Sequence, residues 1–385
     1  MRRAAVGKPP ARQTASGRST SDGRGVRGGR GECHREGASW GRLPRAGWVA
    51  RWGFMNTRIF GRTGRSVGEV GLGTWQLGAG WGDVTDEAAL ATLRAAWDAG
   101  TTLFDTADVY GMGRAETLIG KFLAETPSAR SGGLYVATKL GRFSPPGWPE
   151  NFSRAGIRLH TEASLKRLGV EALDLTQLHC VPFAVLKQGE VFEHLRELKR
   201  EGKIRDFGVS VESMEEADFC VRTDGVAALQ IIFNIFRQKP IHTLFAEAKQ
   251  RQVALLVRLP LASGLLGGKM TQGTTFPAND HRNFNRDGQQ FNVGETFAGL
   301  PFAKGVELAD ALKAFVPAGQ TLSELALRWC LDFDAVGTII PGARNPEQAR
   351  ANARVAALPP LGFALHARLA EFSARDVAAH IRGPY

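Results

Sequence analysis

The sequence lacks any apolar run of the roughly 18 residues that a membrane-spanning helix needs, and its first residues lack the apolar stretch of a secretory signal. We therefore expect a cytoplasmic protein with no membrane partner. Cysteine is scarce: the four residues show neither close pairing nor metal-ligand spacing, so we expect no disulfide framework and no metal site. Tyrosine is scarcer still, because the 385 residues include three, Tyr110, Tyr135 and Tyr385.

Acidic residues are rare in the first 54 positions, where eleven Arg and one Lys face three acidic side chains. This segment therefore carries +9 of the formal net charge of +11. It is rich in Gly, Arg and Ser and has no helical or strand period, which predicts a disordered extension. A translated stretch upstream of a true start at Met55 is the favoured explanation; a basic targeting peptide and a nucleic-acid-binding arm are the alternatives. We place the folded domain at residues 55–385 and expect it to bind no nucleic acid.

The folded part alternates short apolar runs with longer amphipathic stretches. Continuous apolar character predicts strands buried on both faces of a parallel sheet. Eight such units in about 300 residues favour a (β/α)8 TIM barrel over an open doubly wound sheet with a second domain. The strands are expected at 70–73, 101–104, 134–138, 173–178, 204–208, 227–232, 253–257 and 336–340. The helices are expected near 86–99, 114–124, 154–168, 189–200, 213–221, 241–250, 304–314 and 346–356.

Two segments depart from a plain barrel. Residues 57–71 predict an N-terminal β-hairpin cap, two short strands around a Gly-rich turn that close the bottom of the barrel. Residues 271–303 form a connection after the seventh strand that far exceeds the usual loop length of about 4–6 residues. Long loops of this kind usually serve a functional site.

Polar residues follow the predicted strands at the carboxyl edge of the sheet, where barrel enzymes have their active sites. Asp105 ends the second strand and Tyr110 follows it, Lys139 ends the third, His179 the fourth and Ser210 the fifth. A lone strand-end Asp is more often a structural cap, and a lone His is more often a buried core residue. Asp105, Tyr110, Lys139 and His179 together at one mouth suggest proton transfer to a carbonyl oxygen during hydride delivery. Tyr110 would give the proton, Lys139 would lower its pKa, Asp105 would hold the lysine, and His179 would orient the substrate oxygen.

The segments "VGLGTWQLG", "LFDTADVYG", "ATKLG", "SLKRLGVEALDLTQLH", "LKREGKIRDFGVS", "PLASGLLGGK" and "IIPGARNPEQARAN" appear in this order. Together they resemble the aldo-keto reductases over about residues 57–357. The resemblance implies a barrel enzyme that reduces an aldehyde or ketone with a nicotinamide dinucleotide. The family's Asp, Tyr, Lys and His tetrad maps onto Asp105, Tyr110, Lys139 and His179.

The C-terminal motif also has a physical interpretation. A strand runs through Gly342 into a helix capped by Asn345, whose free N–H groups favour an anion, and Arg344 adds a phosphate ligand. Gln348 and Asn352 share one face of that helix. A solvated capping turn is the alternative for this motif alone. The matching family positions hold the 2′-phosphate and adenine, which implies NADPH.

The resemblance implies further cofactor ligands. Ser210 and Gln230 match nicotinamide-carboxamide ligands, and the pyrophosphate loop supplies Pro260, Leu261, Gly264, Leu265 and Lys269. Two positions depart from the pattern: Val211 stands where the family usually has Asn, and Arg258 where many members have an aromatic residue. Because a guanidinium repels an oxidised nicotinamide, Arg258 predicts tighter binding of the reduced cofactor. The loop does not match a P-loop, which excludes that ATPase class.

We expect Trp75 and Trp81 to line the substrate pocket, with Phe143, Trp148 and residues 271–303 as further candidates. The sequence thus predicts an NADPH-dependent reductase acting on a small carbonyl compound. A nucleotide-binding regulatory or redox-sensing barrel with little turnover is the alternative. The sequence does not indicate the substrate's identity, the physiological direction or the oligomeric state.

Overall fold

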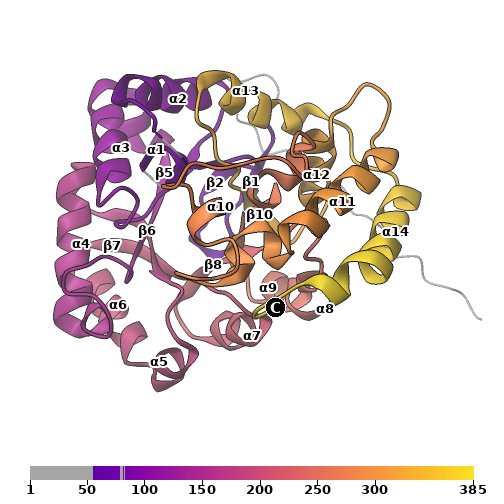
Figure 1. Cartoon of the computed structure of the whole chain (residues 1–385). Helices are drawn as coiled ribbons and strands as arrows, with labels where there is room; N and C mark the ends of the chain where they lie inside the picture. The colour runs from indigo at the N-terminus through magenta and orange to yellow at the C-terminus, as the bar shows by residue number, and fades with distance from the viewer. Residues whose placement is uncertain (1–54, 79–80, 82) are drawn as a thin grey trace, which may run out of the picture. The chain divides into compact units, whose positions relative to one another are not determined.

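The computed structural model describes residues 55–78, 81 and 83–385. Eight parallel strands lie side by side in chain order, and isolated parallel bridges from Val70 to Ile339 and from Gly73 to Gly342 join the first to the last. This closure confirms the predicted (β/α)8 barrel and excludes the open doubly wound sheet (Figure 1). The strands are β3 (Leu72–Gly73), β4 (Leu103–Asp105), β5 (Tyr135–Leu140), β6 (Leu173–His179), β7 (Ile204–Ser210), β8 (Val226–Ile232), β9 (Ala254–Arg258) and β10 (Val336–Ile339).

Helices alternate with these strands, and side-chain caps mark where several of them begin. Thr85, Ser153, Ser213, Thr321 and Asn345 each accept a hydrogen bond from a backbone amide three residues later, which satisfies a donor that the helix leaves free. The helices at predicted positions are α2 (Asp86–Asp98), α3 (Arg114–Glu125), α4 (Arg154–Leu168), α6 (Glu190–Arg200), α7 (Met214–Arg222), α8 (Pro240–Thr243), α9 (Phe245–Gln250), α11 (Phe302–Leu312) and α13 (Pro346–Arg354).

Five helices have no counterpart in the prediction: α1 (Trp75–Gly78), α5 (Phe183–Gln188), α10 (His281–Phe284), α12 (Leu322–Leu331) and α14 (Phe363–Phe372). The predicted helix 241–250 is divided into α8 and α9 at Leu244, whose backbone leaves the helical region with φ −126° and ψ −38°. The most deeply buried of the five is α12, which has eight buried residues, whereas α14 of equal length has two.

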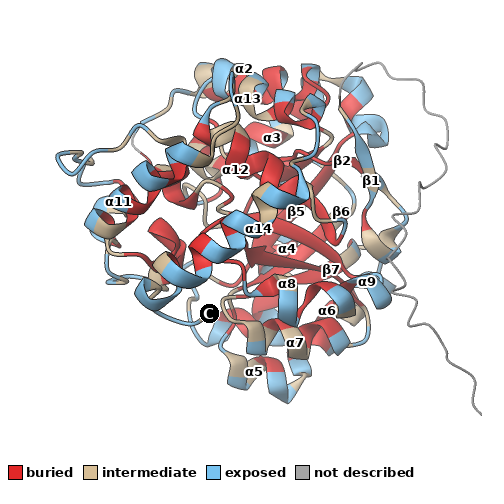
Figure 2. Ribbon diagram, turned by 90° about the vertical axis from the view of Figure 1, so that its right-hand side faces the viewer, coloured by how far each residue is buried: buried red, intermediate tan, exposed pale blue. Residues whose placement is uncertain are grey.

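The strands are buried on both faces, as their continuous apolar character predicts. Every residue of β5, β8 and β9 is buried, and Figure 2 shows the strands as a buried centre with helices around it. Polar residues within these strands, such as Lys139 and Gln230, are therefore buried too. Burial of a polar group is costly unless it is hydrogen-bonded, so these positions call for a chemical explanation.

The predicted hairpin is present as β1 (Thr57–Ile59) and β2 (Ser66–Gly68), which pair antiparallel. Phe60 and Val67 from this hairpin are fully buried and join a cluster with Leu103, Tyr135 and Ala254, which begin β4, β5 and β9. The hairpin therefore closes the end of the barrel at which the strands start, and the opposite end remains for the site.

The long connection runs from β9 to α11 and contains α10 and short 3-10 turns at Val293–Glu295 and Phe297–Gly299. An antiparallel bridge joins Asp280 in this connection to Trp81 in the segment before α2. In the described residues no helix is long and apolar enough to cross a membrane. The prediction of a disordered extension at residues 1–54 lies outside the described part of the chain.

Candidate active site

Four predicted residues, Asp105, Tyr110, Lys139 and His179, meet at the ends of β4, β5 and β6. Lys139 Nζ donates hydrogen bonds to Asp105 Oδ1 at 2.6 Å and to Tyr110 Oη at 3.2 Å. The Tyr110 and His179 rings meet edge to face with centroids 6.0 Å apart. Parallel strands bring their carboxyl ends to one edge, which is why residues up to 74 positions apart converge here.

The Lys139–Asp105 ion pair is buried, and further hydrogen bonds satisfy its remaining atoms. Lys139 Nζ also donates to the Thr106 carbonyl at 2.8 Å. Asp105 Oδ2 accepts from Gln230 Nε2 at 2.7 Å and from Gln177 Nε2 at 3.2 Å. A buried ion pair offsets its desolvation cost only with such additional partners. The arrangement fixes the ammonium beside the tyrosine hydroxyl.

The pKa of Tyr110 differs from the expectation. Burial raises the pKa of Tyr110 above its ordinary value, and the Lys139 ammonium offsets only part of that increase. The expected net lowering is therefore wrong for the protein alone, because loss of water around the phenolate outweighs the nearby cation. Burial would also lower the pKa of Lys139, but Asp105 and Tyr110 outweigh it, so the net shift is upward. Tyr110 is thus a protonated hydroxyl beside a charged lysine.

His179 is neutral at physiological pH. Burial lowers its pKa well below the ordinary value, and the cations Arg142, Lys139 and Arg258 lower it further. Its Nδ1 has no hydrogen-bond partner among the described residues. A neutral imidazole can position a carbonyl oxygen by hydrogen bonding without competing with Tyr110 as the acid.

Two cavities in the described part of the chain meet at this group. One measures about 1080 Å³ and the other about 860 Å³. Trp75, Tyr110, His179 and Glu295 line both. A molecule in either cavity would therefore lie against Tyr110 and His179. We call the larger the outer cavity and the smaller the α13 cavity.

The α13 cavity contains most of the predicted cofactor ligands. Its lining includes Gln230, Arg258, Pro260, Leu261, Gly264, Lys269, Gly342, Arg344, Gln348 and Asn352. Ser210 and Leu265 do not line it; both are buried, and the Ser210 hydroxyl lies 3.6 Å from Cys180 Sγ. Sequence spacing alone does not show whether the side chain of a strand-end residue points into the cavity or, like that of Ser210, toward the adjacent strand.

The residues of the α13 cavity fit a dinucleotide. Arg344 and Lys269 supply positive charge, and α13 begins here with Asn345 as its cap and Pro346 as its first residue. Gln348 Oε1 accepts from the Arg344 amide at 2.9 Å and Asn352 Nδ2 donates to the Gly342 carbonyl at 3.2 Å, so both brace this turn.

Within the lining of the α13 cavity, the Gly342 backbone lies close against the Gln76 side chain. A Cβ at Gly342 would lie 2.0 Å from Gln76 Nε2, and buried Gln76 Oε1 has no partner in the described residues. Leu259, Ala262 and Ser263 have positive φ values, a conformation that costs energy at non-glycine residues and clusters at binding sites.

Arg258 is held by its own partners within this cavity. Its Nη1 lies 3.1 Å from Glu295 Oε2, and its Nη2 donates to the Val211 carbonyl at 3.1 Å. Glu295 compensates the guanidinium charge, which weakens the expected repulsion of an oxidised nicotinamide. The preference for a reduced cofactor stays a prediction.

The outer cavity has an aromatic side and a polar side. Trp75, Trp148 and Phe291 supply aromatic surface. Trp81 does not line this cavity; it packs on Trp75 and on His281 and faces the α13 cavity. Phe143 also lies away from the outer cavity, against His160.

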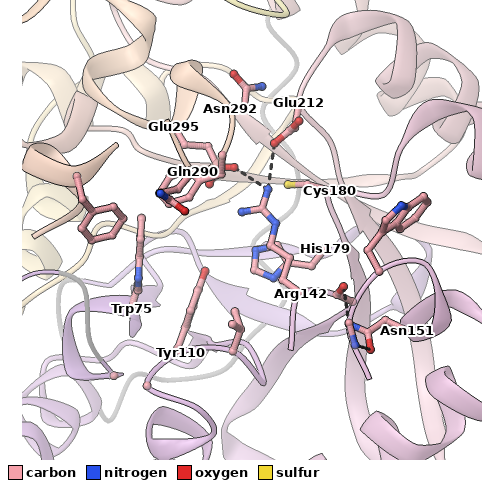
Figure 3. Close-up of a pocket in the computed structure, with 18 of the residues that line it drawn as sticks. Trp75, Tyr110, Arg142, Asn151, His179, Cys180, Glu212, Gln290, Asn292 and Glu295 are labelled. Carbon is pink, nitrogen blue, oxygen red and sulfur yellow. Dashed lines mark hydrogen bonds and ion pairs between the residues drawn. The ribbon is translucent and has the colours of Figure 1, made fainter. Parts of the chain in front are cut away.

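The polar side of the outer cavity contains residues that were not predicted, above all Arg142, Glu212 and Glu295. Arg142 Nη2 pairs with Glu212 Oε1 at 3.0 Å and with Glu295 Oε1 at 2.8 Å (Figure 3). Burial and the neighbouring Glu295 raise the pKa of Glu212. The pKa of Glu295 is lowered despite its burial, because Arg142 and Arg258 surround it.

Cys180 lies beside this polar group. Its Sγ and one oxygen each of Glu212 and Glu295 fall within 4.8 Å of one another. Burial raises the pKa of the thiol to about 12, so the metal-binding thiolate form is disfavoured. The two guanidinium groups already balance the carboxylates, so the cluster fits a charge-compensated pocket wall better than a metal site.

Most of the described chain matches one known protein family. The model of the "Aldo/keto reductase family" matches residues 69–373. The chain belongs to this family. Its members are NAD(P)H-dependent oxidoreductases, and this chain is one of them.

Individual relatives agree with this assignment. The chain is 34% identical over 295 residues to aldo-keto reductase YhdN of Bacillus subtilis, covering 75% of this chain and 85% of that protein. It is 29% identical over 337 residues to pyridoxal 4-dehydrogenase of Microbacterium luteolum, covering 77% and 91%. Among solved structures, glycerol dehydrogenase AKR11B4 from Gluconobacter oxydans is similar with a TM-score of 0.68 and 31% identity, covering 83% and 96%.

Proposed function

We propose that the enzyme reduces a small aldehyde or ketone in the outer cavity with NADPH held in the α13 cavity, and that Tyr110 donates the proton. The observation that supports this most strongly is the meeting of the two cavities at Tyr110 and His179. NADPH supplies a hydride when bound. The residues of the chain have to orient the carbonyl, exclude water and deliver a proton to the carbonyl oxygen.

Each residue of the group has a role that follows from its contacts. The neutral His179 and the Tyr110 hydroxyl both direct hydrogen-bond donors toward the carbonyl oxygen, which polarises it. As negative charge develops on that oxygen, Tyr110 Oη transfers its proton. The Lys139 ammonium at 3.2 Å stabilises the resulting phenolate, and Asp105 keeps that ammonium charged and in place.

The preference for NADPH over NADH is assigned to Arg344. This side chain is exposed and lines the α13 cavity just before the first turn of α13. The 2′-phosphate adds negative charge that a guanidinium binds through a charge-assisted hydrogen bond. Such contacts contribute roughly 1.5–3 kcal/mol.

Arg344→Ala should therefore weaken NADPH binding by about one to two orders of magnitude and leave NADH binding within a few-fold. Titration of both nucleotides by fluorescence quenching measures this. Arg350→Ala is the matched control, because Arg350 is an exposed arginine of α13 that does not line the cavity. Equal weakening of both nucleotides by Arg344→Ala would contradict the assignment.

The polar wall of the outer cavity indicates a hydroxylated substrate. Arg142 offers donors and Glu212 offers acceptors close to His179, while Trp75 and Phe291 offer apolar faces. Two relatives carry names of enzymes for hydroxylated compounds, pyridoxal and glycerol. We infer a small carbonyl compound with at least one hydroxyl group.

NADPH oxidation with a panel of carbonyl compounds tests the proposal. Glyceraldehyde and propanal make a matched pair of similar length, one with hydroxyls and one without. Lower KM for glyceraldehyde supports the substrate class, and equal KM values contradict it. Tight NADPH binding without turnover of any aldehyde, ketone or sugar would instead support the redox-sensing alternative.

A further inference from the structure

A chain of buried polar side chains that the proposed mechanism does not use lies behind the wall of the outer cavity. It consists of Asp108 in the loop between β4 and α3, His160 in α4, and Asn151 in the 3-10 turn Glu150–Phe152. Asp108 and Asn151 are completely buried and His160 nearly so. Asn151 also lines the outer cavity. Figure 3 shows Asn151 on the side of the pocket away from Trp75.

The hydrogen bonds of Asn151 fix the orientation of its amide. Its Nδ2 donates to the Gly141 carbonyl at 2.9 Å and to the Phe143 carbonyl at 2.6 Å. Its Oδ1 accepts from the Gly147 amide at 3.0 Å. Carbonyls only accept and amides only donate, so the amide cannot be turned over. Asn151 thereby holds the backbone on both sides of Arg142.

The orientation of Asn151 determines the tautomer of His160. His160 Nε2 lies 2.8 Å from Asn151 Oδ1, which can only accept, so the hydrogen is on Nε2. Burial, with a further contribution from Arg167, lowers the pKa of His160. The ring is therefore neutral and its Nδ1 carries a lone pair. That nitrogen lies 3.5 Å from Asp108 Oδ2.

A lone pair can face a carboxyl group favourably only if the carboxyl is protonated. Neither oxygen of Asp108 has a hydrogen bond of good geometry among the described residues, although the Val109 backbone amide lies close enough to favour its charged form. Burial raises its pKa to about 8, Glu116 of α3 raises it too, and Arg167 of α4, the Val109 amide and Lys139 of β5 oppose this. The lack of well-placed donors and the surrounding charges both favour a neutral acid, whose O–H has to close the 3.5 Å separation from His160 Nδ1 to form a hydrogen bond.

We propose that protonated Asp108 is a positioning residue for the substrate wall, by which we mean the part of the outer cavity formed by residues 141–151. Asp108 donates its O–H to His160 Nδ1, and His160 in turn holds Asn151 and the 141–151 loop in place. Its consequence for turnover rests on the proposed function, because that loop carries Arg142 and Trp148 into the outer cavity. The relay itself does not touch the α13 cavity.

The relay predicts an effect of pH on substrate binding. As pH rises past about 8, Asp108 loses its proton, and its carboxylate then faces the Nδ1 lone pair. The interaction between Asp108 and His160 then becomes repulsive, so the His160 ring no longer fixes Asn151 firmly. The 141–151 loop becomes more mobile as a result. KM for the carbonyl compound should rise, whereas the Kd for NADPH should not change.

Asp108→Asn tests this, because the amide keeps a donor for Nδ1 and cannot ionise. KM of the unmodified protein should rise several-fold between about pH 7 and about pH 9.5, whereas KM of the variant should stay within about two-fold. His160→Gln is the conservative comparison, since a glutamine can accept from Asp108 and donate to Asn151. The same alkaline rise in Asp108→Asn as in the unmodified protein would overturn the proposal.

Nitrogen NMR of the histidine rings gives a readout that needs no turnover. The signal missing from His160→Gln identifies His160 in the unmodified protein. It should be the neutral Nε2–H tautomer at neutral pH and should shift as Asp108 ionises. A doubly protonated ring or an Nδ1–H tautomer would refute the relay. If the carbonyl panel shows no turnover, the proposed function fails while this measurement still decides the relay.

Discussion

Lys139 is the residue on which the arrangement of the active site depends most. Its ammonium contacts Asp105, Tyr110 and the Thr106 carbonyl at once. Removal of one partner from a buried ion pair leaves the other charge uncompensated, which is more costly than never having had the pair. The same contact on which the proposed proton transfer depends therefore supports the fold.

Lys139→Met should lower the free energy of unfolding by about 3–5 kcal/mol, measured by urea denaturation. Adding Asp105→Asn to this variant should recover part of the loss, because the unpaired carboxylate is then absent. Gln177 and Gln230 remain to bind the asparagine oxygen. A loss of less than about 0.5 kcal/mol in the single variant would show that the pair contributes no more than an ordinary surface contact.

The sequence predicted the residues of the tetrad but not all of their neighbours. Asp105, Lys139 and His179 stand at or next to strand ends, a position that the apolar runs reveal, and Tyr110 follows β4 by five residues. Arg142 and Glu212 follow their strands by only two residues each, so the same signal was available for them. Glu295 lies in the long connection, where no periodic pattern indicates which side chains face the cavity. The relay through Asp108 depends on packing between α4 and the β4–α3 loop, which the sequence does not show.

At the scale of the element, helix α12 was not predicted although its start carries a sequence signal. Thr321 accepts from the Glu324 amide at 3.2 Å, and the Glu324 carboxylate accepts from the Thr321 amide at 2.7 Å, forming a capping box. That signature was present in the sequence. It was missed because eight strands with one helix each already accounted for the expected barrel. In this protein α12 follows α11 and the short helix α10 between the last two strands.

Loss of the cap should weaken α12 measurably. Thr321→Ala should cost about 1 kcal/mol of the free energy of unfolding, measured without nucleotide because Thr321 also lines the α13 cavity. Ser213→Ala is the matched comparison, since Ser213 caps α7 through the Glu216 amide at 3.1 Å and lies outside that cavity. Unchanged stability in Thr321→Ala, with a loss in Ser213→Ala, would mean that tertiary packing alone fixes the start of α12.

At the scale of the whole molecule, the barrel follows from the sequence because most residues of the parallel strands are buried, on both faces of the sheet. That requirement gives continuous apolar runs whose order along the chain is also their order around the barrel. The boundaries differ from the expected ones by one to two residues at most strand ends, where polar residues such as Asp105 and His179 are counted in the strand by their backbone pairing. The cytoplasmic location and the role of residues 1–54 stay predictions.

Deletion of residues 1–54 should leave both the melting temperature and kcat/KM unchanged. The segment is Gly- and Arg-rich, and it lacks the apolar period with which a chain joins a core. Thermal unfolding and NADPH-dependent turnover of the full chain and of residues 55–385 measure this. A fall in melting temperature on deletion would show that the segment stabilises the barrel.

The most direct test of the account as a whole is the rate of carbonyl reduction by Tyr110→Phe. The substitution removes one hydroxyl and keeps the ring against Trp75 and His179. General acid catalysis typically contributes about 10²–10⁴-fold, so kcat should fall by at least about 100-fold while the Kd for NADPH stays within a few-fold. A kcat within a few-fold of that of the unmodified protein, at equal NADPH affinity, would contradict the assignment of Tyr110 as the proton donor.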